Sequence, residues 1–209
     1  MFPPLYAIID ATTTAEPVAL AKKLADAGAT LIQLRDKRSS ARKVYGDSQE
    51  LVDQLIPRGI RFIVNDRADI AAMVGASGVH VGQDDLPVED ARRFCKPPCW
   101  VGVSTHNLNQ LREADRTSAD YIAVGPIFPT VTKENPDPVV GLELLRTARE
   151  FTHKPLVAIG GIIAGNAAQV YAAGADSVAV IRDLASATDP VEQVRKFLAI
   201  AERAISARS

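Results

Sequence analysis

The sequence predicts a single α/β domain of the (β/α)8 barrel class. Short apolar runs rich in β-branched residues alternate with longer, Ala-rich segments of helical period along the chain. The apolar runs are nearly continuous in hydrophobicity, which is typical of parallel strands that are buried on both faces. Polar residues recur directly after these runs, and barrel enzymes carry their active sites at the C-terminal ends of the strands.

Eight strands are expected, each a run of apolar residues that stops at a polar or glycine position. They are LYAIID (5–10), TLIQLR (30–35), RFIVND (61–66), GVHVG (78–82), WVGVS (100–104), DYIAVG (120–125), PLVAIG (155–160) and SVAVI (177–181). Eight helices are expected at 16–27, 40–56, 67–74, 87–95, 107–116, 140–151, 166–173 and 189–205. Because crossovers between parallel strands are right-handed, eight such units close into a barrel.

A doubly wound open sheet is the alternative architecture. That fold usually carries a glycine-rich fingerprint after its first strand, whereas here the first strand runs into Asp10-Ala11-Thr12. The pattern therefore favours the barrel. With 209 residues and 47% hydrophobic content, the chain suffices for one sizeable core, so residues 1–209 are expected to form one catalytic domain.

Charge and the N-terminal sequence limit the partners and the compartment. The 24 Lys and Arg residues nearly balance the 25 Asp and Glu residues, so bulk charge favours neither nucleic acid nor an anionic membrane. The start MFPPLYAIID lacks a basic region and a long apolar segment, which argues against a signal peptide or a membrane span. We expect small-molecule substrates and a cytoplasmic location; the sequence does not indicate an oligomeric state.

The two cysteines, Cys95 and Cys99, lie in the segment CKPPC between a predicted helix and a predicted strand. A zinc site would need further ligands, and the three histidines are distant in sequence. Two free thiols in a connecting loop are therefore the favoured interpretation, over a disulfide or a metal site.

Polar residues collect where the predicted strands end, so they should meet on one rim of the barrel. In chain order they are Gln33, Arg35 and Lys37; Asn65, Asp66 and Arg67; Gln83, Asp84 and Asp85; Ser104 and His106; Thr130, Thr132 and Lys133 in the loop 125–133; Gly160 and Gly161; and Val180, Ile181 and Arg182. This set indicates a composite binding site and not a single isolated group.

Charge type suggests what the rim binds. Arg35 and Lys37 attract oxyanions, while Asp66 and Asp85 would repel an anion unless a divalent cation lay between them. Mg2+ is typically held by one or two carboxylates together with substrate phosphate oxygens, so we predict a Mg2+-bound pyrophosphate. In the alternative interpretation Asp66 caps the following helix and pairs with Arg35. Only one of Asp84 and Asp85 need point inward.

A second anion site is suggested by Gly160-Gly161, since glycines let backbone N–H groups approach a phosphate and barrels often bind one after strands 7 and 8. A tight turn out of the seventh strand is the alternative explanation, and the pair alone does not decide between the two.

Six motifs, taken together, resemble thiamine phosphate synthases: QLRDK (33–37), VNDRADIA (64–71), GVHVGQDDLP (78–87), VGVSTH (101–106), GPIFPTVTK (125–133) and AIGGI (158–162). Each motif is ordinary, but their order and spacing extend the resemblance from about residue 5 to 182. The resemblance implies a Mg2+-dependent transferase that joins hydroxymethylpyrimidine pyrophosphate to thiazole phosphate, releasing pyrophosphate.

The resemblance also implies a role for each residue of the rim. Asp66 and Asp85 would bind Mg2+. Pyrophosphate would be bound by Arg35, Lys37, Lys133 and Asn65, and the pyrimidine by Gln33 and Ser104. The thiazole phosphate would be bound by Thr130, Thr132, Gly161 and the backbone near Val180 and Ile181. The last two assignments are uncertain by one residue, Gly160 or Gly161 and Val180 or Ile181.

Two other functions remain open at this point. A thiazole tautomerase is built on a similar barrel, but it transfers a proton. It would therefore need an acid-base residue such as His106, and it would not need the cluster that binds Mg2+ and pyrophosphate. The second alternative function is that of a noncatalytic sensor of phosphorylated ligands. The Arg35, Lys37, Asp66, Asp85 and Lys133 set favours the synthase.

Overall fold

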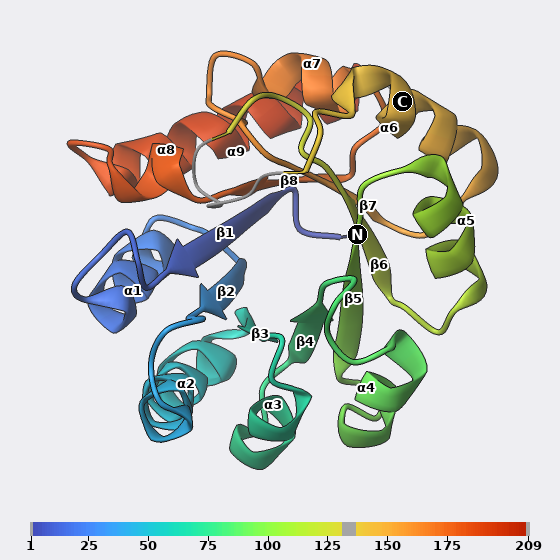
Figure 1. Ribbon diagram of the computed structural model, residues 1–209. Helices are drawn as coiled ribbons and strands as arrows, with labels where there is room; N and C mark the ends of the chain where they lie inside the picture. The colour runs from blue at the N-terminus through green and yellow to red at the C-terminus, as the bar shows by residue number, and fades with distance from the viewer. Residues whose placement is uncertain (1, 131–136, 208–209) are drawn as a thin grey trace.

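The computed structural model describes residues 2–130 and 137–207 and has the eight-stranded closed barrel that the sequence predicts (Figure 1). The strands follow one another around the barrel in chain order, all parallel, and β8 pairs with β1. They are β1 (Leu5–Asp10), β2 (Leu31–Arg35), β3 (Arg61–Asn65), β4 (Gly78–Val81), β5 (Trp100–Thr105), β6 (Tyr121–Val124), β7 (Leu156–Ile159) and β8 (Ser177–Val180).

Helices surround the barrel at the positions that the helical periodicity predicts. They are α1 (Pro17–Asp26), α2 (Ala41–Leu55), α3 (Ala68–Val74), α4 (Val88–Phe94), α5 (Leu108–Arg116), α6 (Gly141–Phe151), α7 (Ala167–Ala172) and α9 (Pro190–Ser206). A 3-10 turn, η1 (Ile56–Arg58), and the short helix α8 (Arg182–Ala185) were not among the predicted elements. Four residues are too few to show a helical period, so α8 gives no sequence signal.

Local hydrogen bonds explain where several helices begin. The Ser40 hydroxyl accepts from the Lys43 amide at the start of α2, Asn107 caps α5 through Gln110, and the Asp189 carboxylate accepts two amides at the start of α9. Each cap satisfies an N–H group that the first turn leaves without a helical partner. These helices therefore start at fixed residues and set the lengths of the connections that follow β2, β5 and α8.

The core has two separate parts because successive side chains of a strand point to opposite faces. Residues on the outer face of the strands pack against the helices in one large cluster, which includes Ala7, Ile9, Ile32 and Leu34. Residues on the inner face form a second cluster that fills the barrel axis, with Tyr6, Ile8, Leu31, Ile63, Tyr121, Ala123, Val157 and Ala179. The barrel is thus a packed core whose polar residues are restricted mainly to one end.

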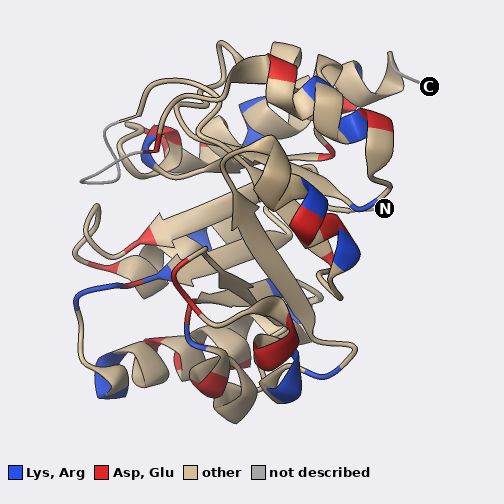
Figure 2. Cartoon of the chain, turned by 45° about the vertical axis from the view of Figure 1, so that its right-hand side comes forward, with Lys and Arg blue, Asp and Glu red and all other residues tan. Residues whose placement is uncertain are grey.

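Charge is distributed as expected for such a fold. Figure 2 shows basic and acidic residues intermixed along the outer helices, while the strands are mostly uncharged. None of the helices in the described residues is both long enough and apolar enough to cross a membrane.

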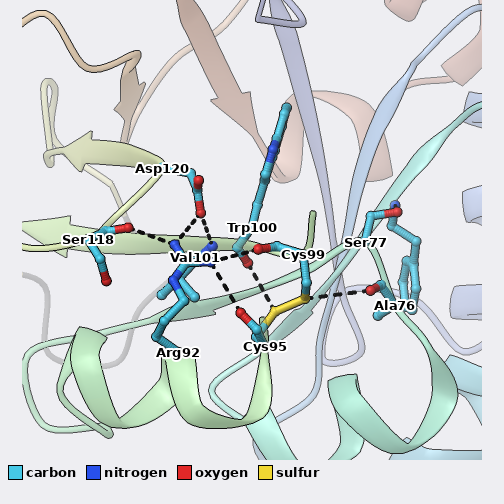
Figure 3. Close-up of a disulfide and its surroundings, with 10 residues drawn as sticks. Ala76, Ser77, Arg92, Cys95, Cys99, Trp100, Val101, Ser118 and Asp120 are labelled. Atoms are coloured by element: carbon cyan, nitrogen blue, oxygen red, sulfur yellow. Dashed lines mark hydrogen bonds and ion pairs between the residues drawn. A yellow bond between two sulfur atoms is a disulfide. The ribbon is translucent and has the colours of Figure 1, made fainter. Parts of the chain in front are cut away.

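The interpretation of Cys95 and Cys99 as two free thiols is wrong, because the structure joins them in a disulfide with the two Cα atoms 5.3 Å apart (Figure 3). The bond closes the turn between α4 and β5. Arg92 reinforces this turn, since its guanidinium donates to the carbonyl oxygens of Cys95 (3.2 Å) and Cys99 (2.7 Å) (Figure 3). It also donates to the carbonyl oxygen of Ser118 (2.6 Å), which follows α5.

We expect the disulfide to stabilise the folded chain by about 2 kcal/mol, because a cross-link over a short loop restricts the unfolded state. Urea denaturation with and without dithiothreitol measures the effect, and the reduced protein should unfold at lower urea. The Cys95→Ala/Cys99→Ala double variant is the control, and its midpoint should not respond to dithiothreitol. Equal stability of the oxidised and reduced protein would contradict the expectation.

Candidate active site

Most of the predicted site residues lie on the inner face of the strands or directly beyond the strand ends. Gln33 and Arg35 are two residues apart in β2, so both point to the same face, and the register pairs Arg35 with Asp10 of β1. Asn65 of β3 is paired with His80 of β4 in the same way. The register of the barrel therefore brings residues from separate motifs to one rim.

Asp10 holds Arg35 at this rim. The Asp10 carboxylate is fully buried and forms an ion pair with the Arg35 guanidinium, whose side chain is 21% exposed. Its other oxygen accepts from the Thr12 amide (2.9 Å) and hydroxyl (2.6 Å). Asp10 was not among the predicted site residues, although a carboxylate at the end of an otherwise apolar strand is a sequence feature that could have identified it. The expected alternative partner of Arg35, Asp66, is not the one found.

Asp66 and Asp85 come together, as predicted, and Lys37 joins them. The Lys37 Nζ lies 2.9 Å from Asp66 Oδ2. Burial and the neighbouring Asp85 carboxyl raise the pKa of Asp66 to about 6, although Lys37 acts in the opposite direction. Asp85 is fixed by a hydrogen bond from the Gly82 amide (2.8 Å), and Asp84 is exposed. Asp85 is thus the inward member of the acidic pair.

The helix-capping alternative for Asp66 is wrong. Helix α3 has Arg67 at its N-cap, and no side chain caps it. Asp66 has a φ of 61°, in the left-handed region that residues other than glycine seldom adopt, though Asp tolerates it better than most. A strained backbone and a carboxylate pressed against another carboxylate are features of a site that is organised for a ligand.

The residues at this position fit a magnesium ion. Two carboxylates in contact disfavour each other's ionised form, and a divalent cation between them would remove that penalty. No group of three or more His, Cys, Asp and Glu residues that could hold a metal is found in residues 2–130 and 137–207. Two carboxylates with no third protein ligand are the donor set that Mg2+ uses when substrate phosphate oxygens and water complete its coordination.

Gln33 and Ser104 are connected through the barrel interior by three residues that the sequence analysis did not assign. Gln33 Nε2 donates to the Tyr6 hydroxyl (2.6 Å), which lies 2.9 Å from the Tyr121 hydroxyl. His80 contacts the Tyr121 hydroxyl through Nδ1 (3.0 Å) and Ser104 Oγ through Nε2 (2.9 Å). Burial lowers the pKa of His80 to about 4, so its imidazole is neutral at neutral pH.

The predicted phosphate site lies where the loop after β6 meets the end of β7. The amides of Ile127 and Phe128 donate to the carbonyl oxygens of Ile159 (2.9 Å) and Gly160 (3.0 Å). A Cβ on Gly161 would lie 2.5 Å from the Pro129 carbonyl oxygen, and Gly161 has a φ of 63°. The loop that leads into Thr130 therefore packs directly against Gly161, where a larger residue would clash.

The remaining predicted positions differ in what the structure says of them. Val180 is a buried residue of β8, whereas Ile181 is partly buried at the start of α8. Thr132 and Lys133 lie outside the described residues. His106 was considered as an acid-base residue, but its Nδ1 contacts the Gly125 carbonyl oxygen at 2.6 Å and its Nε2 lies 3.6 Å from Asp137.

The raised pKa of Asp66 predicts a pH-dependent stability in the absence of divalent ions. Because the folded-state pKa of about 6 exceeds the unfolded value, the stabilising contribution of protonated Asp66 is complete below about pH 4 and is lost as the pH rises through 6. Relative to Asp66→Asn, the wild type should lose on the order of 1 to 3 kcal/mol of unfolding free energy between pH 4 and pH 7. Denaturant titrations of both proteins measure it. The prediction would be contradicted if the difference in unfolding free energy between the wild type and Asp66→Asn were the same at every pH.

Comparison with known proteins identifies the family of the chain. Residues 5–184 match the family model described as thiamine monophosphate synthase. The chain is 50% identical over 204 residues to a thiamine-phosphate synthase of Koribacter versatilis, covering 95% of both chains, and 45% identical over 180 residues to that of Methanospirillum hungatei, covering 86% and 87%. The solved thiamine phosphate pyrophosphorylase of Pyrococcus furiosus superposes with a TM-score of 0.89 at 35% identity, covering 97% of this chain and 96% of that one. The chain belongs to the thiamine monophosphate synthase family.

Proposed function

We propose that this chain condenses hydroxymethylpyrimidine pyrophosphate with thiazole phosphate to give thiamine phosphate and pyrophosphate. The observation that carries the proposal is the combination of cations and paired carboxylates, Arg35, Lys37, Asp66 and Asp85, at one rim of a barrel whose relatives are named thiamine-phosphate synthases. A substrate with a pyrophosphate group and a bound divalent cation would satisfy both kinds of charge at once.

Mg2+ is the cofactor we propose, with Asp66 and Asp85 as its protein ligands. When bound, it would neutralise negative charge on the pyrophosphate oxygens as the leaving group departs. The contact between the two carboxyl groups supports this assignment. Lys37, now paired with Asp66, is near enough to the same position to bind a pyrophosphate oxygen once the carboxylate has a metal ion as its partner.

The other residues of the rim would bind and orient the two substrates. Arg35, fixed by Asp10, and Asn65 would contact the pyrophosphate, and Lys133 would contact it from the loop after β6. Gln33 and Ser104 would contact the pyrimidine. The thiazole phosphate would be held by Gly161, Thr130, Thr132 and the backbone at Val180 and Ile181. Of the residues uncertain by one position, Ile181 is only partly buried whereas Val180 is buried, and Gly160 and Gly161 are both partly buried.

The reaction follows from this arrangement without a strong base. The bond between the pyrimidine methylene carbon and the pyrophosphate oxygen breaks with its electron pair on the oxygen, while the electron-rich aminopyrimidine bears the positive charge. The lone pair of the thiazole nitrogen then forms the new carbon–nitrogen bond. The protein contributes by stabilising charge on the leaving group and by aligning the two rings.

The tautomerase alternative is less well supported. It requires an acid-base residue, and His106, the candidate, has its Nδ1 in contact with a backbone carbonyl. It also gives no role to the Asp66–Asp85 pair. A noncatalytic sensor has no separate observation in its favour, and turnover decides against it directly.

The test of the proposed function is incubation of the purified chain with both phosphorylated heterocycles and Mg2+. Formation of thiamine phosphate and pyrophosphate in equal amounts supports the proposal. Tight binding of the substrates without any product would support a sensor, and conversion of thiazole phosphate alone to an isomer would support the tautomerase.

Asp66→Ala and Asp85→Ala should each abolish Mg2+-dependent turnover, because each removes a proposed metal ligand. We expect losses in kcat on the order of 10² to 10³ or more, comparable to those for lost transition-state ligands. Asp84→Ala is the matched control, since Asp84 is adjacent and exposed, and it should retain activity. Steady-state kinetics with circular dichroism measures both activity and folding. Unchanged metal dependence in either ligand variant would rule out the shared metal site.

The two proposed anion sites should respond differently to substitution. Charge develops on the leaving pyrophosphate, so Arg35→Ala and Lys133→Ala should mainly lower kcat. The thiazole phosphate keeps its charge throughout, so Thr130→Val should mainly raise the KM for that substrate. Steady-state kinetics with each substrate varied separately measures the difference. The reverse pattern would mean that the two sites are exchanged.

A further inference from the structure

A continuous chain of hydrogen bonds crosses the barrel interior between Gln33 and Ser104, and we call it the interior chain. Its members are Gln33 of β2, Tyr6 of β1, Tyr121 of β6, His80 of β4 and Ser104 of β5. The four links measure 2.6, 2.9, 3.0 and 2.9 Å in that order. Its two end residues, Gln33 and Ser104, are the residues that we propose to contact the pyrimidine.

The interior chain is built into the packing of the barrel. The side chains of Tyr6 and Tyr121 are 1% and 0% exposed, and their rings pack edge to face with centroids 5.9 Å apart. Gly102 makes room for Tyr121, because a Cβ at that position would lie 2.0 Å from the phenol carbon Cζ. A buried hydroxyl group without a hydrogen-bond partner destabilises the folded state, so every hydroxyl of the interior chain strongly favours a hydrogen bond to each of its neighbours.

A chain of this composition has only two fully satisfied arrangements of its protons. Each tyrosine hydroxyl has one proton to donate, and a neutral imidazole has one donor and one acceptor nitrogen. If Gln33 donates to Tyr6, then Tyr6 donates to Tyr121, Tyr121 to His80 Nδ1, and His80 Nε2–H to Ser104 Oγ. In the reverse arrangement Ser104 donates and Gln33 accepts through its carbonyl oxygen.

The orientation of Gln33 selects the first arrangement, since its amide nitrogen and not its oxygen faces Tyr6. Within residues 2–130 and 137–207, the Gln33 carbonyl oxygen, its second N–H group and the proton of the Ser104 hydroxyl are then left for a ligand. An aminopyrimidine matches this pattern. Its exocyclic amino group donates, and its ring nitrogens accept. An analogue with a carbonyl in place of the amino group presents an acceptor and a ring N–H instead, which is the opposite pattern.

We propose that Tyr6, Tyr121 and His80 are positioning residues that determine pyrimidine specificity, because they hold Gln33 and Ser104 in the hydrogen-bond orientation that accepts an aminopyrimidine and rejects its oxo analogue. This inference rests on the proposed function, since it takes the pyrimidine to contact both ends of the interior chain. It assigns no proton transfer to these residues, and none of the three needs to touch the substrate.

The test compares kcat/KM for the aminopyrimidine pyrophosphate with that for its 4-oxo analogue in the wild type, Tyr121→Phe and Tyr6→Phe. Either substitution breaks the interior chain and frees an end to reorient, so the ratio should fall at least about tenfold. The KM for the aminopyrimidine should rise, while the KM for thiazole phosphate stays constant. The lower intrinsic reactivity of the oxo analogue is the same in every variant and cancels.

Tyr171→Phe is the matched control. Tyr171 is also a buried tyrosine, but its hydroxyl donates to the Pro4 carbonyl oxygen (2.8 Å) and not to a member of the interior chain. It should lower the melting temperature comparably and leave the substrate ratio at the wild-type value, which separates specificity from stability.

Three outcomes decide the question. A fall of the ratio in Tyr6→Phe or Tyr121→Phe, but not in Tyr171→Phe, supports the inference; if Tyr121→Phe fails to fold, Tyr6→Phe decides by itself. An unchanged ratio in a folded chain variant, with normal turnover by the wild type, overturns the inference and leaves the proposed function intact. A wild type that neither binds nor converts the aminopyrimidine pyrophosphate overturns both.

Discussion

Closure of eight short parallel strands into a ring is the constraint on which the other features depend. Successive side chains of each strand alternate between the ring interior and the helix layer, so each strand offers only a few inward positions. Apolar and aromatic residues occupy most inward positions below the rim, Gln33 lies level with Ile8 and Ile63 among them, and Asn65 and Ser104 are the last inward residues of their strands. The site is therefore the polar top layer of the same packed interior that stabilises the barrel.

This arrangement forces charged groups into close contact at the rim. Asp66 lies against Asp85 with its backbone in the left-handed region, and Asp10 is fully buried beneath Arg35. At Asp10, the ion pair with Arg35 and the hydrogen bonds from Thr12 offset the free energy of burying the charge. At Asp66, the repulsion from Asp85 remains, and Lys37 offsets it only in part. Local strain of this kind is tolerated because the surrounding barrel fixes the backbone on both sides.

The interior chain shows the same dependence on packing. Its members lie on five strands, and each distance follows from the register of the barrel and from the space that Gly102 leaves for Tyr121. The two tyrosines remain protonated, because burial raises the pKa of both phenols. An interior that only needed to be filled could use phenylalanine at these positions, so the hydroxyls point to a purpose beyond packing.

Local pattern predicted most of the architecture because strand and helix periods depend on neighbours in sequence. All eight strands and eight of the helices appear within about two residues of the expected limits. Helix α8 was missed because four residues show no period, and the disulfide because the spacing of Cys95 and Cys99 does not reveal that their Cα atoms lie 5.3 Å apart. The Asp66–Asp85 contact was predicted correctly because both residues follow adjacent strands.

Residue type and order along the chain, by themselves, determined the barrel class, the polar rim and the family resemblance. The pairing of Arg35 with Asp10, the close approach of Gly161 to Pro129 and the links from Gln33 through His80 to Ser104 were decided only by the tertiary structure. The physical reason is that register, closure and burial act between strands distant in sequence, and they select among polar partners that local pattern leaves equivalent.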